Sequence, residues 1–195
     1  LYKAGAGQCV IENYPRMAIR GIHLGLPPRE EIPFFKRLVR YLMVPMGYNI
    51  VFLEFAGGMR YNRRPEINRA WEKFNQEDTK SGRGYRTGHG DMVAGGSFLE
   101  QDEVADLVAY IRSYGMDVIP EVQSLSHVQY ITCAYPEVGE RDDNSVSERK
   151  IDLRTTDAVP REEYANSYCP SNEKSYEIVF DLIDEIVDVV KPRKY

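Results

Sequence analysis

Several features that would assign a protein to a class at once are scarce in this sequence. Its three cysteines, Cys9, Cys133 and Cys169, are widely spaced and form no paired C-x-x-C motif. Neither a disulfide framework nor a zinc site is indicated, and we expect buried or half-buried thiols. No apolar run approaches the length that spans a membrane, and no signal peptide is visible. We therefore expect no membrane partner, and the localisation stays open.

Charge of one sign is also scarce. The net charge is −5, and the basic residues are scattered among acidic ones. The one local cluster of arginines, Arg60, Arg63 and Arg64, is too small for the basic stripe that nucleic-acid binding requires. We therefore expect no nucleic-acid partner. The overall balance of apolar and charged residues is that of an ordinary globular domain.

The sequence does contain an alternation of strand and helix patterns. Apolar runs predict strands, and apolar residues at i, i+3, i+4 and i+7 predict amphipathic helices. In chain order we expect strands at residues 17–24, 49–55 and 116–120, and helices at residues 33–46, 103–113 and 172–190. Strand, helix and strand joined by short connections make the strands parallel.

Two long polar stretches interrupt this order, and each follows a strand. Residues 57–98 and 135–170 have no sustained apolar period, so we expect long loops there, after a lead-in segment at residues 1–16. Long loops after the strands and tight returns before them are typical of a (β/α)8 TIM barrel, which has eight strands in about 250 residues. We therefore interpret residues 1–195 as its N-terminal portion, about three βα units of an α/β fold, and expect the remainder of the barrel in the parent chain.

Polar side chains end two of the predicted strands. Glu54 closes the second strand, Glu121 closes the third, and His127 follows six residues after Glu121. Ligands gather at the carboxyl ends of parallel strands, so these three residues are candidates for binding. Each has a structural alternative, such as a loop histidine with satisfied hydrogen bonds or a loop carboxylate paired with an arginine. His23 lies inside the first strand, and we expect it in the core.

The segment that contains Glu121 is similar to a known motif. Residues 118–127 read V-I-P-E-V-Q-S-L-S-H. This resembles the V-I-P-E-x-D-x-P-G-H of the third barrel strand in the β-N-acetylhexosaminidases of glycoside hydrolase family 20. The spacing from Glu to His is kept, whereas Gln123 stands at the Asp position and Leu125-Ser126 stand at the Pro-Gly. The chain therefore resembles a divergent branch of this family.

The first strand carries a second part of the resemblance. Arg20-Gly21 is similar to the start of the family motif R-G-x-x-x-D-x-x-R, with Gly25 at the Asp position and Arg29 one residue late for the second Arg. In the family that second Arg grips hydroxyls of the terminal sugar, so the resemblance makes Arg29 a candidate for the same role. The alternative is that Arg29 caps or salt-bridges the following helix.

The second strand shows where the chain departs from the family. Gly57-Gly58 stand where the family has a pair of Asp residues, and Glu54 stands at a family His position. Tyr61 and Trp71 follow in the first long loop, where they could stack on a sugar ring or anchor the loop to the body of the domain. Because several family carboxylates are replaced, a non-catalytic carbohydrate-binding or degenerate TIM-barrel protein is the alternative reading.

The resemblance implies a glycoside hydrolase that removes terminal β-linked N-acetylglucosamine or N-acetylgalactosamine by a substrate-assisted retaining mechanism. In the family the catalytic Asp-Glu pair follows the fourth strand, so it implies no catalytic residue in this segment and no turnover by the segment alone. The implied substrate-binding residues are Arg29, Glu54, Glu121 and His127, and the expected partner is a carbohydrate with a terminal N-acetylhexosamine. No cofactor is expected. No metal is expected either, because metal-dependent barrel hydrolases usually carry a His-x-His pair where His23 stands alone.

Overall fold

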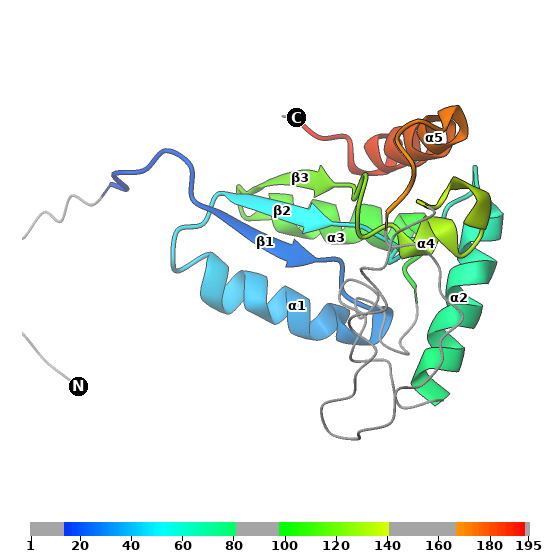
Figure 1. Cartoon of the computed structure of the whole chain (residues 1–195). Coiled ribbons are helices and arrows are strands. Elements are labelled where there is room, and N and C mark those ends of the chain that lie inside the picture. The colour runs from blue at the N-terminus through cyan, green and yellow to red at the C-terminus, as the bar shows by residue number, and fades with distance from the viewer. Residues whose placement is uncertain (1–13, 81–97, 141–166, 194–195) are drawn as a thin grey trace, which may run out of the picture.

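The computed structural model describes residues 14–80, 98–140 and 167–193 (Figure 1). Its centre is a parallel sheet with the strand order β1 (Gly21–Gly25), β2 (Ile50–Glu54) and β3 (Asp117–Glu121). The strands pair so that Gly25, Glu54 and Glu121 form one row across the sheet. The predicted α/β class with three parallel strands is confirmed.

Within the described ranges, five α-helices accompany the sheet. In chain order they are α1 (Ile32–Leu38), α2 (Pro65–Lys80), α3 (Gln101–Ser113), α4 (Gln129–Thr132) and α5 (Glu173–Val190). α3 contacts both α1 and α5, while α3 and α5 contact β3, and α2 contacts α4. Figure 1 shows α1 and α3 running along the sheet, with α2 and α4 beyond the ends to which the strand arrows point. Helices therefore cover one side of the sheet and also stand beyond its carboxyl end.

The two faces of the sheet are covered differently. Val51 and Leu53 point to one face and are buried in the core. The other face carries a row of three paired residues, His23, Phe52 and Ile119. His23 is exposed, and Phe52 and Ile119 are half-buried. Side chains alternate between the faces along a strand, so Gly25, Glu54 and Glu121, two positions after this row, lie on the same side. We call this side the open face.

The first predicted helix is present, but its second half is wound differently. α1 continues as a π-helical segment, Val39–Met43, in which the N–H of Val44 donates to the carbonyl of Val39 at 3.0 Å. Hydrogen bonds that span five residues widen the turn and shift the apolar stripe. Val39 and Met43 are buried as predicted, whereas Leu42 and Met46, which the regular period placed on the same stripe, are exposed.

The predicted loop over residues 57–98 is wrong in its middle, where α2 lies. Only a narrow stripe of this helix is apolar, with Ile67 and Trp71 buried, and polar residues occupy most other positions. Ile67, Ala70, Trp71 and Phe74 do stand at the i, i+3, i+4 and i+7 positions of a helix, so the period is present in the sequence but spans only two turns among polar residues. Residues 81–97, 141–166 and 1–13, which hold the rest of that loop, most of the second loop and most of the lead-in, lie outside the described residues.

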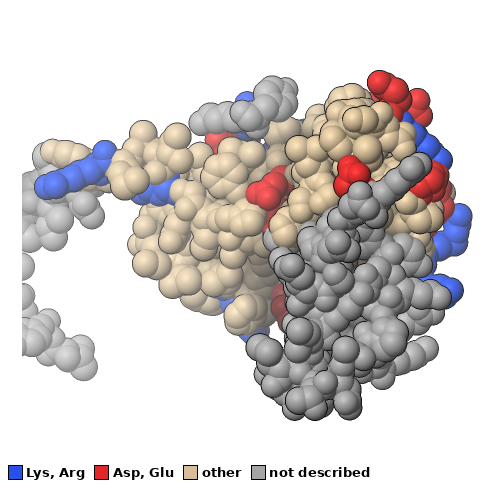
Figure 2. Space-filling model, viewed as in Figure 1, with Lys and Arg blue, Asp and Glu red and all other residues tan. Residues whose placement is uncertain are grey.

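α5 is tied to the loop that precedes α2. Two arginines of the cluster noted in the sequence pair with acids on this helix, Arg63 with Asp184 and Asp188, and Arg64 with Asp181. Figure 2 shows acidic and basic side chains next to one another along the edge where α5 and α2 lie. These two arginines therefore form ion pairs within the chain.

Two further predictions concern the membrane and the thiols. In the ranges that the structure describes, no helix is long and apolar enough to cross a membrane. Cys133 and Cys169 are free thiols of intermediate exposure, as predicted, and Cys9 lies outside those ranges.

Candidate functional site

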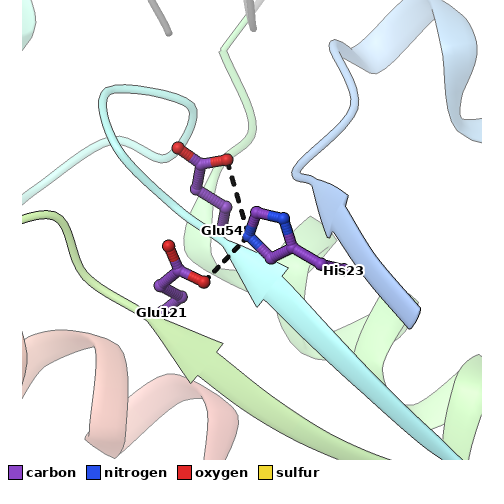
Figure 3. A group of neighbouring side chains, drawn as sticks. All are labelled: His23, Glu54 and Glu121. Carbon is purple, nitrogen blue, oxygen red and sulfur yellow. Dashed lines mark ion pairs between the residues drawn. The ribbon is translucent and has the colours of Figure 1, made fainter. Parts of the chain in front are cut away.

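The carboxyl ends of the three strands bring three titratable side chains together. Glu54 ends β2 and Glu121 ends β3, and the parallel register places the two glutamates side by side. His23 lies two residues before Gly25, the partner of Glu54, so its side chain emerges on the same face. Figure 3 shows the imidazole of His23 turned toward both carboxylates. We call these three residues the rim triad.

Distances within the rim triad are those of direct contact. His23 Nε2 lies 2.8 Å from Glu121 Oε2 and 3.7 Å from Glu54 Oε2. The Glu54 side chain is only 5% exposed, whereas the side chains of His23 and Glu121 are 51% and 45% exposed. One carboxylate is therefore buried at the base of the triad, and the other two groups face the open side.

Gln123 fixes the buried carboxylate. Its side-chain amide donates to Glu54 Oε1, and its side-chain carbonyl accepts the main-chain N–H of Ala56 at 3.0 Å. Ala56 has a left-handed φ of 38°, and its own carbonyl accepts the hydroxyl of Tyr61 at 2.6 Å. A buried amide that is bonded on both sides holds one rotamer. Gln123 therefore leaves the second oxygen of Glu54 directed at His23.

His23 corrects a prediction. The sequence placed it in the core, but its side chain is half exposed because the face of β1 that carries it is the open face. The signal that could have found it is the alternation within β1, where the apolar Ile22 and Leu24 alternate with Gly21, His23 and Gly25. An apolar run that is read without its two faces hides this histidine.

Arg29 lies near the same end of the sheet but in a different set of contacts. It begins the short turn Arg29–Glu31 after β1, and it donates through Nε and Nη2 to the two carboxylate oxygens of Glu103, at 2.6 and 2.8 Å. Its Nη2 also donates to the carbonyl of Phe98 at 2.8 Å. The hydrogen bond between the two side chains lowers the pKa of Glu103 and raises that of Arg29. Arg29 is therefore joined to α3 and to Phe98 just before it, whereas the rim triad is formed by other residues.

His127 lies in the loop between β3 and α4. It is half-buried and has a left-handed φ of 59°, and Leu125 two residues earlier has a φ of 69°. Two residues other than glycine in this region within one short loop are uncommon and mark a constrained backbone. The carbonyl of Leu125 accepts the N–H of Tyr168 at 3.1 Å, which ties the loop to the segment before α5. A role of His127 in binding stays a prediction.

Of the two roles that the sequence left open for Tyr61 and Trp71, stacking on a sugar and anchoring the loop, the structure shows the second. Trp71 and Tyr61 are 2% and 1% exposed. The indole stacks on Phe74, with ring centroids 5.2 Å apart. A Cβ added at Gly57 would lie 2.2 Å from Trp71 Nε1, so the indole fills the space of any side chain there. The first position of the family's Asp pair is therefore closed by packing in this chain.

The sequence of this chain matches that of a known protein family. Residues 59–195 match the catalytic domain of glycosyl hydrolase family 20. The chain belongs to this family. The resemblance of residues 118–127 to this family is thereby confirmed. The matched part of the family domain includes Glu121 and begins after His23 and Glu54.

Solved structures of family 20 enzymes share the fold. A glycoside hydrolase family 20 β-N-acetylglucosaminidase superposes with a TM-score of 0.58 and 20% identity, covering 92% of this chain and 36% of that one. The β-N-acetylhexosaminidase from Streptomyces coelicolor A3(2) gives 0.58 and 16%, covering 92% and 32%. That from Bacteroides fragilis NCTC 9343 gives 0.58 and 17%, covering 91% and 30%. The chain spans about a third of the length of these three proteins.

Proposed function

We propose that this family 20 chain is the N-terminal part of a (β/α)8 barrel whose parent protein removes terminal β-linked N-acetylglucosamine or N-acetylgalactosamine from glycans. The observation that carries the proposal is the match to the family's catalytic domain over residues 59–195. Three parallel strands with polar groups at their carboxyl ends support it, because that end of a barrel carries the active site. Because fold alone does not determine chemistry, the substrate is argued from the family.

The reaction proposed is substrate-assisted hydrolysis with retention. The family's Glu, on the strand that would follow α5, protonates the leaving oxygen. The Asp beside it steadies the 2-acetamido group of the sugar while that group attacks the anomeric carbon. This route differs from the two-carboxylate scheme of most glycosidases. We assign neither step to a residue of this chain.

Binding of the terminal sugar is the role proposed for the residues at the strand ends. Glu121 is half exposed beside the open face, and carboxylate oxygens accept hydrogen bonds from sugar hydroxyls. Glu54 orients the triad from its buried position, and His127 would add a polar group from the loop after β3. Arg29 would contribute through Nη1, because its bonds to Glu103 and Phe98 use Nε and Nη2.

A chromogenic N-acetyl-β-D-glucosaminide tests the proposal. The purified parent protein should release the chromophore, whereas residues 1–195 alone should bind sugar without turnover. The parent variant Glu121→Gln should have a raised KM, because it keeps the side-chain shape and loses the stronger charged acceptor. The matched control Glu177→Gln alters an exposed glutamate on α5 and should behave as wild type. Turnover by residues 1–195 alone would contradict the assignment of catalysis to later strands.

A second candidate is a carbohydrate-binding protein without catalysis. The packing of Trp71 against Gly57 favours it, because an acid cannot occupy that position without moving the indole. The same assay separates the two functions. A parent protein that binds N-acetylglucosamine in calorimetry but releases no chromophore would be a binder, and our proposal of hydrolysis would then be wrong.

A further inference from the structure

The rim triad places two carboxylates against one imidazole, since Glu54 and Glu121 both lie next to His23 Nε2. Side-chain nitrogen and carboxylate oxygens are also ligands that divalent transition metals accept. We propose that His23, Glu54 and Glu121 bind a divalent transition-metal cation such as Zn²⁺ or Mn²⁺. This site goes beyond the proposed glycosidase, whose chemistry uses no metal.

The positions of the three ligand atoms fit one ion. All three lie within 4.8 Å of one another. Bonds of about 2.1 Å at angles of 90 to 110° place neighbouring ligand atoms roughly 3.0 to 3.4 Å apart. The distances from His23 Nε2 to the two glutamate oxygens, 2.8 and 3.7 Å, bracket that range. The two glutamate oxygens are at most 4.8 Å apart. Rotation of the His23 and Glu121 side chains, which are about half exposed, would bring the three atoms to the spacing that one ion requires.

A supporting group for the ligands is already in place. Ligating carboxylates are usually held by a second hydrogen bond, which orients the oxygen that binds the metal. Gln123 provides that bond to Glu54 Oε1 and is itself held by the N–H of Ala56. The ligand oxygen Glu54 Oε2 is thereby presented to His23 from a nearly buried side chain. Such fixed orientation is what separates a metal site from a chance meeting of acidic side chains.

An independent observation comes from α4. The hydroxyl of Tyr130 is buried and has no hydrogen-bond partner within the part of the chain that the structure describes. Burial raises its pKa most, and the charges of Tyr168 and Glu54 add to the effect. A buried hydroxyl without a partner calls for a water molecule or an ion-bound group nearby. A hydrated cation beside Glu54 would supply one.

The arrangement also explains why the sequence predicted no metal. A His-x-His pair gathers ligands along one strand, whereas here each of three adjacent strands supplies one ligand from its carboxyl end. Three ligands on one side of an ion leave its other positions facing the open side of His23 and Glu121. Water or a polyol hydroxyl could occupy those positions, as in metal sites that keep an open coordination position.

Metal binding by the full chain tests the inference without any activity assay. After treatment with a chelator, the protein is titrated with ZnCl₂ and, separately, MnCl₂ in a calorimeter, and the bound metal is counted by mass spectrometry. We expect one saturable equivalent. His23→Ala and Glu121→Gln should each weaken binding at least about tenfold, and Gln123→Ala should weaken it by about tenfold through the loss of orientation. The control Glu177→Gln, at an exposed position on α5 outside the triad, should bind metal as wild type.

A measurement on the wild-type protein guards against variants that do not fold. The chain has three histidines, so their ring nitrogens can be followed individually by nuclear magnetic resonance during the zinc titration. The His23 Nε2 signal should shift at one equivalent, with that of His127 unchanged. The inference is overturned if no saturable equivalent binds, or if zinc shifts another histidine and His23→Ala binds as wild type. Either result leaves the glycosidase proposal intact, because that proposal needs no metal.

Discussion

Two groups of charged side chains occupy the same end of the sheet. We call one the balanced group because it has as many arginines as carboxylates, and the other, the rim triad, the unbalanced group because it has two carboxylates and one histidine. Arg29 and Arg60 alternate with Glu100 and Glu103 at the start of α3, with each arginine within 3.2 Å of a carboxylate. In the rim triad two carboxylates share one histidine. The ion pairs of the first group join the loop after β1 and the loop after β2 to α3, so its arginines and carboxylates pair with one another within the chain. In the second group the side chains of His23 and Glu121 are about half exposed, so they can contact a ligand.

The largest effect should come from the group that fixes the rim triad. Gln123→Ala removes a donor from buried Glu54 and an acceptor from the N–H of Ala56. We expect the free energy of unfolding to fall by about 2 kcal/mol, since buried polar groups are left without their partner. Urea denaturation of the variant measures this fall. Ser124→Ala, at the exposed neighbouring position, is the control and should change stability by less than about 0.5 kcal/mol. Equal effects of the two variants would show that the hydrogen bonds of Gln123 to Glu54 and Ala56 do not stabilise the fold.

A smaller and pH-dependent effect should follow from breaking the balanced group. Arg29→Ala removes a two-point ion pair with Glu103, and because both side chains are partly exposed we expect a loss of about 1 kcal/mol at neutral pH. Arg29 lowers the pKa of Glu103 in the folded protein. The pair therefore stabilises the fold above the ordinary pKa of a glutamate, and this contribution is lost as the pH falls through the lowered value.

The stabilising effect of the Arg29–Glu103 pair should depend on pH. The difference in unfolding free energy between wild type and Arg29→Ala should be full at pH 7 and should shrink in strongly acidic buffer, below about pH 4. Arg69→Ala, which removes an exposed arginine on α2, is the control and should show little difference at either pH. A difference that persists unchanged into acid would mean that Arg29 acts through packing and not through charge.

The smallest effect should come from removing a charge on the unbalanced side. Glu121→Gln reduces the repulsion between two carboxylates while it weakens the contact with His23, so we expect a change within about 0.5 kcal/mol. The matched change Glu103→Gln, in the balanced group, should cost about 1 kcal/mol because it leaves Arg29 without its charged partner. Denaturation of the two variants side by side checks the contrast. If Glu121→Gln costs as much as Glu103→Gln, the rim triad is a structural ion pair.

The sequence allowed the strands and the larger helices to be predicted for a clear physical reason. β2 and β3 are apolar runs that end at a carboxylate, so the sequence indicates both where the strands lie and where they end. α5 carries a wide apolar stripe between the capping residue Asn172 and the left-handed Lys191. α2 was missed although Ile67, Ala70, Trp71 and Phe74 carry the helical period, because that stripe spans only two turns within a long polar stretch. The π-helical turn after α1 shifts the apolar stripe, and the sequence gives no sign of that shift.

The site was predictable only in part. Glu54 and Glu121 were named because each ends a strand, and strand ends meet at one edge. His23 was assigned to the core because the sequence does not show which face of β1 the helices cover. The contact between Gln123 and Glu54 joins residues 69 positions apart and depends on the register of β2 and β3. The partner of Arg29 is likewise fixed by how α3 packs.

A crystal structure of the parent protein with N-acetylglucosamine bound tests the central claim most directly. The account predicts the pyranose at the carboxyl ends of β1, β2 and β3, with a ring hydroxyl in hydrogen-bonding distance of Glu121. A sugar bound at another surface, with the rim triad covered by the rest of the chain and out of its reach, would contradict it.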